Sequence, residues 1–346
     1  MTRVLHVTES YGGGVAYAIE TYIRNSADVD HHVLAAVREA AKPGDQLPGA
    51  TYATLPSGSI KAILALRRSV KALKPDVVHA HSSIAGVLCR VALANRRTRR
   101  LVYTPHCYAF ERTDVGAPAR TLFRAAEWLL ARNTGILAAC GEREAVLSRD
   151  LGHRDVRLIP NVASAKIGRA HQLDPGPQPI LSAGGRLSAQ KDPGHFLDVK
   201  RRLDAHLPEA RWRWVGGGDE AWAARLRAAD IEVTGWLPQQ DSMAKIAEST
   251  VYLHTAQWEG FPLAVLEAVR MQVAVLVRPI KAFDTVPEHL HLYDKNLTRL
   301  VPADSDNSST SLEASDHNIA CWRELLAHNT DHHQADALRQ LYPLPG

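Results

Sequence analysis

Short apolar runs alternate with longer segments of helical periodicity along most of this chain. In the first half, the runs at 4–8, 76–80 and 101–105 are followed by helical patterns at 15–25, 84–94 and 120–132. Strands that alternate with helices of this length form βα units, and such units assemble into a parallel sheet. The pattern therefore predicts a doubly wound α/β domain.

The alternation begins again after a segment that interrupts regular structure. Residues 160–179 contain four prolines and two glycines, a composition typical of a linker. Beyond it, 180–185, 212–216, 251–254 and 273–277 resemble strands and 195–207 resembles a helix. The chain has 346 residues, whereas single hydrophobic cores usually stop growing at about 250 to 300 residues. We therefore expect two Rossmann-like domains facing each other across a cleft that holds the active site.

The expected domains are 1–165 on the acceptor side and 166–318 on the donor side, followed by a terminal helix over 319–346. Residues 303–318 are rich in Ser, Asp and Asn and lack apolar periodicity, so we expect a polar loop there. Helical periodicity returns through Ile319, Trp322, Leu325, Leu326, Leu338 and Leu341. We expect this last helix to return to the N-terminal domain.

The composition excludes several classes of protein. With 45% hydrophobic and 23% charged residues, the chain is an ordinary globular sequence. Its four cysteines include no C-x-x-C pair, which argues against a zinc ribbon or a disulfide scaffold. No run approaches the roughly 18 apolar residues of a membrane span, and the N-terminus lacks the apolar segment of a signal peptide. We expect a cytoplasmic protein.

Basic residues gather at two places in the first half of the chain. One is the amphipathic stretch 60–74, and the other is the run Arg96, Arg97, Arg99 and Arg100. These residues either form a solvated surface or bring the protein to the inner face of the cell membrane as a peripheral contact. Nucleic acid is not an expected partner, because no aromatic residues are interleaved with these charges.

Two glutamates bracket a predicted helix start. Glu259 and Glu267 are separated by seven residues, and Pro262 between them suits a first helical position. A helix N-terminus offers unpaired N–H groups and about half a positive charge to an anion such as a diphosphate. A carboxylate farther along the helix accepts hydrogen bonds from vicinal hydroxyls, such as those of a ribose. The segment fits a nucleotide sugar, and the alternative is a surface helix with solvated glutamates.

This segment resembles the E-x7-E donor-site signature of the retaining family 4 glycosyltransferases, which have the GT-B fold. Gly184-Gly185-Arg186 followed by Gln190-Lys191-Asp192 resembles the family's G-G-R-x4-E-K-G element, with Gln190 and Asp192 in place of the usual glutamate and glycine. Segments 215–219, 233–237 and 104–106 resemble the family's glycine-rich loop, base-binding segment and T-x-H segment. The resemblance covers nearly the whole chain and is closest to bacterial surface-polysaccharide enzymes. It departs most at 271–273 and 278–282.

The resemblance implies a role for each matched residue. Arg186 and Lys191 would stabilise the leaving diphosphate, Glu259 would contact the sugar, Glu267 would hold the ribose, and His106 would face the donor sugar. The other implied donor-binding residues are Gly13, Gly14, Gly185, Gly216, Thr234, Gly235, Gly260, Phe261, Pro262, Leu263 and Ala264. The glycines at 12–14 also suit a purely structural tight turn.

No metal and no other cofactor is expected. A fixed Arg-Lys pair stabilises the charge of a leaving diphosphate without a metal. His79 and His81 lie on one predicted strand, and we expect their side chains to face opposite sides, as a poor pair of metal ligands.

The expected function is retaining, metal-independent transfer of a sugar from a nucleotide-sugar donor to an acceptor hydroxyl. The acceptor would be a carbohydrate or a lipid-linked sugar in bacterial polysaccharide or glycoconjugate biosynthesis. Two alternatives stay open at this point. One is a nucleotide-sugar epimerase of the same fold, and the other is a non-catalytic nucleotide-sugar-binding subunit of a polysaccharide assembly complex.

Overall fold

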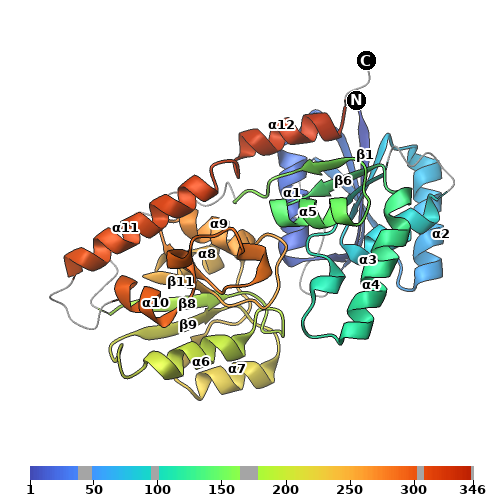
Figure 1. The fold of residues 1–346 in the computed structure, drawn as a ribbon. Coiled ribbons are helices and arrows are strands. Elements are labelled where there is room, and N and C mark those ends of the chain that lie inside the picture. Colours follow the sequence, from blue (N-terminus) through green and yellow to red (C-terminus); the bar gives the residue numbers. More distant parts are fainter. Residues whose placement is uncertain (38–48, 95–100, 164–177, 302–307, 344–346) are drawn as a thin grey trace. The chain divides into compact units, whose positions relative to one another are not determined.

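The computed structural model describes residues 1–37, 49–94, 101–163, 178–301 and 308–343. The chain divides into two compact units, shown as ribbons in Figure 1. Unit 1 comprises Met1–Val162 and His328–Gly346, and unit 2 comprises Ala163–Ala327. The basic run from Arg96 to Arg100 lies outside the described residues.

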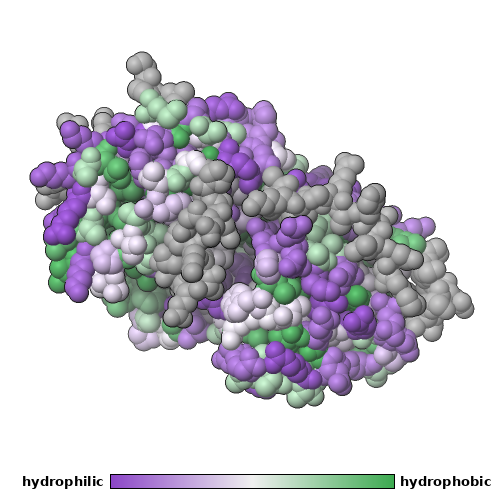
Figure 2. Space-filling view, turned by 180° about the vertical axis from the view of Figure 1, so that it is seen from behind, coloured by the Kyte–Doolittle hydropathy of each residue, from purple (hydrophilic) through white to green (hydrophobic). Residues whose placement is uncertain are grey.

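Hydrophilic and hydrophobic residues are interspersed on the surface seen in Figure 2. Among the helices in the described ranges, none combines the length and the apolar character needed to cross a membrane.

Unit 1 is built on a parallel sheet with the strand order β3-β2-β1-β4-β5-β6-β7. The strands are β1 Arg3–Tyr11, β2 Asp30–Val37, β3 Ala50–Thr54, β4 Val77–His81, β5 Leu101–Thr104, β6 Ile136–Ala139 and β7 Val156–Leu158. The helices are α1 Gly13–Arg24, α2 Ser59–Leu73, α3 Ser83–Ala92, α4 Ala117–Leu130, α5 Glu142–Asp150 and α12 Asp331–Leu341, with 3₁₀ turns at Ala109–Glu111 and Ala131–Asn133.

The central strands of unit 1 are buried on both faces, as expected of a parallel sheet covered by helices. Successive side chains alternate between the faces. Leu5 and Val7 of β1 pack with residues of α2 and α3 in one cluster. Val4 packs with Tyr22 of α1 and Leu338 of α12 in another. His6 lies on the same face as Val4, so this face carries buried polar groups.

Unit 2 contains a second parallel sheet, in the order β10-β9-β8-β11-β12. Its strands are β8 Ile180–Gly184, β9 Arg211–Val215, β10 Ile231–Val233, β11 Val251–His254 and β12 Ala274–Val277. Its helices are α6 Pro193–Leu203, α7 Glu220–Arg227, α8 Gln239–Ala247, α9 Leu263–Arg270, α10 Asp294–Leu300 and α11 Ser308–Leu325, with 3₁₀ turns at Lys281–Phe283 and Glu288–Leu290.

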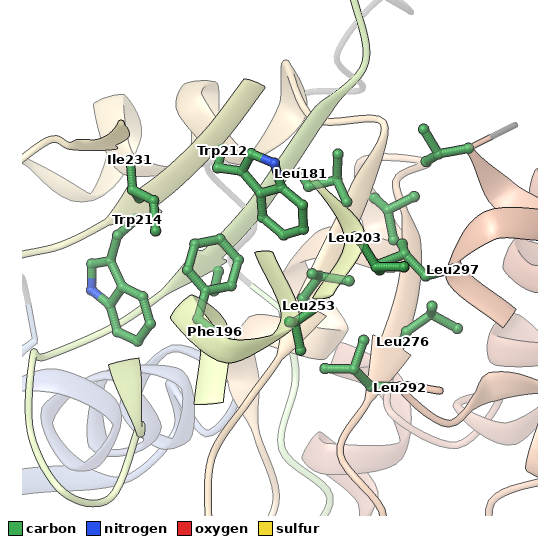
Figure 3. Packing of buried hydrophobic residues seen from close by; sticks show 14 of the residues in the cluster. Leu181, Phe196, Leu203, Trp212, Trp214, Ile231, Leu253, Leu276, Leu292 and Leu297 are labelled. Carbon is green, nitrogen blue, oxygen red and sulfur yellow. The ribbon is translucent and has the colours of Figure 1, made fainter. Parts of the chain in front are cut away.

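Large apolar side chains, most of them leucines, pack together in unit 2 with three aromatic residues, as Figure 3 shows. The ring of Phe196 from α6 meets the rings of Trp212 and Trp214 from β9 edge to face, at centroid distances of 5.5 and 5.8 Å. Edge-to-face contact is a favoured arrangement of aromatic rings. The prediction of two doubly wound parallel-sheet domains is confirmed.

The expected polar loop over 303–318 is wrong from residue 308 onward, where α11 begins. Two buried side chains hold this helix on β12 through three hydrogen bonds. The Asn318 side chain accepts a hydrogen bond from the backbone N–H of Val275 at 2.8 Å and donates one to its carbonyl at 3.0 Å. The indole of Trp322 donates to the same carbonyl at 2.9 Å. Asn318, whose residue type favours loops, thus lies buried and holds α11 on the sheet by hydrogen bonds.

The single terminal helix expected over 319–346 is also wrong. Residues 319–325 end α11 in unit 2, and the chain begins a second helix, α12, in unit 1. Thr330 caps α12 by accepting a hydrogen bond from the His333 N–H at 3.3 Å. Asp331 then pairs with Arg24 of α1 at 2.7 Å. The expected boundary at 318/319 therefore falls inside a helix, and the division lies at Ala327/His328.

Candidate functional site

Two glycine-rich loops meet at the carboxyl edge of the sheet in unit 2. The backbone N–H of Gly185, after β8, donates to the carbonyl of Val215 at 2.9 Å, and Leu187 donates to Gly217 at the same distance. Gly216 has a φ of 139°, and a Cβ there would lie 2.2 Å from the carbonyl oxygen of Gly185. Only glycine fits this approach of two backbones. The structure thus brings Gly185 and Gly216 together.

The predicted base-binding segment joins these loops. Thr234 donates its backbone N–H to Trp214 at 3.1 Å. Its hydroxyl accepts a hydrogen bond from the N–H of Gly216 at 3.0 Å and donates to the carbonyl of Gly235 at 2.9 Å. Gly235 follows with a φ of 71° and open space where a Cβ would stand. Backbone hydrogen bonds and the Thr234 hydroxyl therefore hold three predicted donor-site segments together.

Lys191 and Glu259 form an ion pair at the same edge. The Lys191 side chain passes over Gly185, where a Cβ would lie 3.1 Å from Lys191 Cε. Burial raises the pKa of the Glu259 carboxyl, but Lys191 and His254 together lower it by more, through charge and hydrogen bonding, and the resulting pKa is about 2. Glu259 is therefore a buried carboxylate at neutral pH.

His254 is a member of this site that the sequence analysis did not single out. It ends β11, is 2% exposed, and places Nε2 3.5 Å from Glu259 Oε1. Burial lowers the pKa of its imidazole, so the ring is neutral. Its place at the carboxyl end of a parallel strand was the available signal, because ligands of doubly wound sheets bind there.

Helix α9 begins at Leu263 with Pro262 as its N-cap, one residue later than expected. No side chain caps this end and its first turn holds no acidic residue, so the N–H groups of Leu263 and Ala264 suit an anion. Gly260 and Phe261 precede the helix and are half-buried.

Glu267 lies one turn into α9 and is 6% exposed. Burial raises the pKa of its carboxyl to about 7, against a smaller lowering by a hydrogen bond with Gln239. Without ligand the group is close to half ionised at neutral pH. Ribose hydroxyls would supply the donors that a buried carboxylate needs.

Arg186 follows Gly185 and is exposed. It lies at the start of the loop that contains Lys191. Its Cγ lies beside Gly218, because a Cβ on that glycine would be 3.1 Å away. The structure therefore places Arg186 on the same pair of glycine loops as the predicted donor residues.

Two departures from the family pattern contact each other. Asp192, at the usual glycine position, has a φ of 49° and caps α6. Its Oδ2 accepts hydrogen bonds from Arg278 Nη1 at 2.6 Å and Gln257 Nε2 at 3.0 Å. Aspartate tolerates the left-handed region better than most residues. The changed turn after Val277 thus supplies Arg278, which holds Asp192 in the conformation that glycine usually adopts.

A cavity of about 570 Å³ opens beyond Arg278 in unit 2. Its lining includes His195, Arg202, Tyr293 and Lys295 and none of the residues predicted to bind the donor. Arg202 and Lys295 are already paired with Asp294 and Glu288. This cavity therefore does not coincide with the residues predicted to bind the donor.

In unit 1, Gly13 and His106 follow β1 and β5 at the carboxyl edge of the sheet. Gly13 has a φ of 56° and, with Gly14, starts α1 after the first strand. His106 and Cys107 also have positive φ values, of 53° and 96°. Such values are uncommon for residues other than glycine and cluster at functional sites.

The expectation that His79 and His81 face opposite sides is wrong. Residues two apart in a strand share a face, and their ring centroids lie only 4.0 Å apart. With His6 they form a buried trio whose nitrogens lie close enough to coordinate one metal ion. His289, His317 and Cys321 form a second such group on the surface of unit 2. The sequence analysis missed His6 and His289 because their partners come from distant segments.

Comparison with known proteins agrees with the division of the chain into two units. The model of the glycosyl transferase 4-like domain matches residues 13–162, and that of glycosyl transferases group 1 matches residues 178–310. An uncharacterised 41.2 kDa protein in the cps region of Klebsiella pneumoniae is 24% identical and aligns with 93% of this chain and 92% of its own length.

Another relative is the Escherichia coli UDP-Gal:alpha-D-GlcNAc-diphosphoundecaprenol alpha-1,3-galactosyltransferase, which is 26% identical over 60% of this chain and 59% of its own length. Among solved structures, HepE of Anabaena in complex with UDP has a TM-score of 0.75 at 15% identity, covering 99% of this chain and 100% of that chain. Sucrose-phosphate synthase of Thermosynechococcus elongatus has a TM-score of 0.72 at 13% identity, covering 99% and 95%. The two family matches and the fold show that this chain is a nucleotide-sugar-dependent glycosyltransferase with the GT-B fold.

Proposed function

We propose that this chain moves a hexose from a UDP-linked donor to a hydroxyl of a carbohydrate or lipid-linked acceptor, with retention at the anomeric carbon and without a metal ion. The main structural support for this proposal is the Lys191–Glu259 ion pair, which lies beside the glycine loops after β8 and β9. The names of two relatives support the substrate class, since one uses UDP-Gal with a diphosphoundecaprenol-linked acceptor and another is encoded in a cps region.

The main task of such a site is to stabilise the negative charge that develops on the leaving group. As the bond to the diphosphate breaks, negative charge grows on the β-phosphate, and preorganised cations stabilise it. Lys191 and Arg186 supply those cations, and the first N–H groups of α9 add partial positive charge. Glu267 holds the ribose hydroxyls. Glu259 orients Lys191 and contacts the donor sugar.

Retention is assigned to attack by the acceptor hydroxyl on the face that the diphosphate leaves. The leaving phosphate oxygen takes the proton of that hydroxyl, the new C–O bond forms, and the bond to the diphosphate breaks. Glu259 is unsuited to be the nucleophile of a covalent intermediate, because its ion pair with Lys191 and its pKa of about 2 make it a weakly basic carboxylate.

Thermal melting with nucleoside diphosphates tests the donor. UDP at about 100 times its dissociation constant should stabilise the protein by about 2.7 kcal/mol, whereas GDP, dTDP and ADP at equal concentration should give a clearly smaller rise in Tm. The stabilisation should persist in EDTA. A shift with GDP alone would refute the UDP assignment, and loss of the UDP shift in EDTA would refute metal independence.

Peripheral membrane contact is proposed for the exposed faces of α2 and α4 in unit 1. Helix α4 exposes Leu122, Trp128 and Leu129 by 68%, 58% and 66%, and α2 exposes Ile60 by 77%. Apolar side chains beside basic ones are typical of helices that lie in a membrane interface. A lipid-linked acceptor would be reached from such a position.

Flotation with vesicles containing anionic phospholipid tests this contact. The wild-type protein should float with anionic vesicles, and Leu122→Glu with Leu129→Glu should lower the floated fraction several-fold, because two charges would enter the interface. Leu312→Glu, at a leucine 64% exposed on α11 in unit 2, is the matched control and should float normally. Equal flotation of all three proteins would contradict the proposal.

A further inference from the structure

Four histidine side chains form a continuous chain of hydrogen bonds on one face of the sheet in unit 1. His31 Nδ1 lies 3.0 Å from His6 Nε2, and His6 Nδ1 lies 3.0 Å from His81 Nε2. His81 Nδ1 lies 3.1 Å from His106 Nε2. The rings come from β2, β1, β4 and the segment after β5, which are neighbours in the sheet order. The chain therefore crosses the sheet and ends at a predicted site residue.

The contact at the His31 end determines which way the hydrogen bonds of this histidine chain point. His31 Nε2 lies 3.1 Å from the backbone carbonyl oxygen of Ser26, and the Ser26 hydroxyl donates to the carbonyl of Tyr22 at 2.6 Å. A carbonyl oxygen only accepts hydrogen bonds. His31 Nε2 must therefore carry the proton, which leaves His31 Nδ1 as an acceptor.

Each following ring takes the same tautomer. Burial lowers the pKa of His6, His31, His81 and His106, the last to about 4, so each ring is neutral and carries one N–H. His6 Nε2–H donates to His31, His81 Nε2–H donates to His6, and His106 Nε2–H donates to His81. Four protons satisfy four hydrogen bonds. His106 Nδ1 is left with its lone pair, and no other described residue hydrogen-bonds to that nitrogen.

The backbone around His106 is held in an uncommon conformation. The positive φ values of His106 and Cys107 cost free energy unless their surroundings impose them. Glu144 of α5 supplies one restraint, because its carboxylate accepts hydrogen bonds from the N–H of Cys107 at 2.9 Å and of Cys140 at 2.8 Å. The segment thus presents the His106 ring at the end of the chain in a fixed orientation.

We propose that His31, His6 and His81 are positioning residues that hold His106 in the Nε2–H tautomer. If the chain transfers a sugar as proposed above, His106 Nδ1 accepts a hydrogen bond from a hydroxyl of the bound sugar. The subsite selects a hydrogen-bond donor. A carboxylate at the same position, as in a uronic acid, would set its oxygen lone pairs against the lone pair of Nδ1.

A metal ion bound by His6, His79 and His81 is the competing explanation of this cluster. All six ring nitrogens already have partners, since His79 contacts the Tyr342 hydroxyl at 2.5 Å and the Thr104 hydroxyl at 2.8 Å. Two nitrogens on a tetrahedral zinc, each at about 2.0 to 2.1 Å, lie roughly 3.3 Å apart. The 3.0 Å between His6 and His81 instead matches a hydrogen bond.

The tautomers are measurable in the ligand-free wild-type protein. Long-range ¹H–¹⁵N NMR of ¹⁵N-histidine-labelled protein separates protonated from unprotonated ring nitrogens, and His106→Gln assigns the signals of that ring. We expect Nε2 protonated and Nδ1 unprotonated in His106 at neutral pH. A protonated Nδ1 would overturn the proposal. So would a stoichiometric metal whose removal by EDTA shifts the signals of His6 and His81.

A variant at His31 tests the direction of the hydrogen bonds between the histidines. His31→Phe removes the ring that the Ser26 carbonyl orients, so the His106 Nδ1 signal should shift towards the protonated position. His79→Leu is the matched control, because His79 is equally buried in the same cluster but lies outside the chain, and it should leave the His106 signals unchanged. An unchanged His106 in folded His31→Phe would overturn the proposal.

These measurements use no substrate. Failure of any nucleotide to stabilise the protein would refute the proposed donor and leave the tautomer result standing. An Nδ1-protonated His106 in a protein that binds UDP would refute this inference and leave the proposed function standing.

Discussion

Replacement of Lys191 by alanine is expected to lower kcat for sugar transfer by about 10²- to 10³-fold, the usual effect of removing one preorganised group that stabilises transition-state charge. Lys191 is the partly buried cation on the loop beside Gly185, and its partner Glu259 is 9% exposed. Without Lys191, the charge growing on the leaving diphosphate loses its fixed counter-charge. The measurement is release of nucleoside diphosphate and of glycosylated acceptor at saturating donor.

Lys200→Ala is the matched control for this variant. Lys200 also forms an ion pair with an acidic residue in unit 2, at 2.7 Å from Asp204, but both belong to the segment around α6 and neither is a predicted site residue. Its loss should leave kcat within about two-fold, because the pair is local to one segment and lies outside the predicted site. Full activity in folded Lys191→Ala would show that Lys191 does not stabilise the leaving diphosphate.

Replacement of Glu267 by glutamine is expected to stabilise the ligand-free protein at pH 8 and to leave it unchanged near pH 4. The pKa of Glu267 is raised from 4.5 in the unfolded chain to about 7 in the folded protein, by burial. Between these values the folded state binds more protons, so stability falls as pH rises from about 4.5 to about 7. At pH 8 the buried carboxylate costs on the order of 3 kcal/mol, which glutamine avoids.

Urea denaturation at the two pH values measures this difference. Glu220→Gln, at a glutamate whose side chain is 80% exposed and pairs with Arg227, is the control and should change stability by less than about 1 kcal/mol at either pH, because exposed ion pairs contribute little. Glu267→Gln should also weaken stabilisation by UDP, because an amide oxygen accepts hydrogen bonds from ribose hydroxyls less strongly than a carboxylate does. An equal stability of wild-type protein and Glu267→Gln at pH 8 would show that Glu267 is not held in an apolar environment.

Local pattern predicted the strands and turns of unit 2 well because the relevant physics is local. Gly216 could be singled out from the sequence, since only glycine adopts its conformation and tolerates the Gly185 backbone at that distance. The start of α9 was predicted to within one residue, because proline marks helix starts. By contrast, Asn318 and Trp322 hold α11 on β12 through contacts with Val275, more than 40 residues away in the chain, which no local pattern contains.

The buried polar groups of unit 1 could not be assembled from the sequence. His6, His31, His81 and His106 are spread over some 100 residues, and only the parallel register sets β2, β1, β4 and β5 side by side. The shared face of His79 and His81 follows from the two-residue period of a strand, but that period does not reveal which distant rings lie on the same face. Asp192 and Arg278 are likewise 86 residues apart in the chain, and only folding brings them into contact at 2.6 Å.

The sequence by itself determined the two parallel-sheet domains, the glycine loops and the glutamate-bracketed helix, because hydrophobic period, glycine and proline act on neighbouring residues. Only the tertiary structure decided which charges and imidazoles meet. Lys191 with Glu259, Arg278 with Asp192, and His31 through to His106 are contacts between residues far apart in the chain. Protonation states and tautomers depend on burial and on such partners, and both arise only when the sheets have formed.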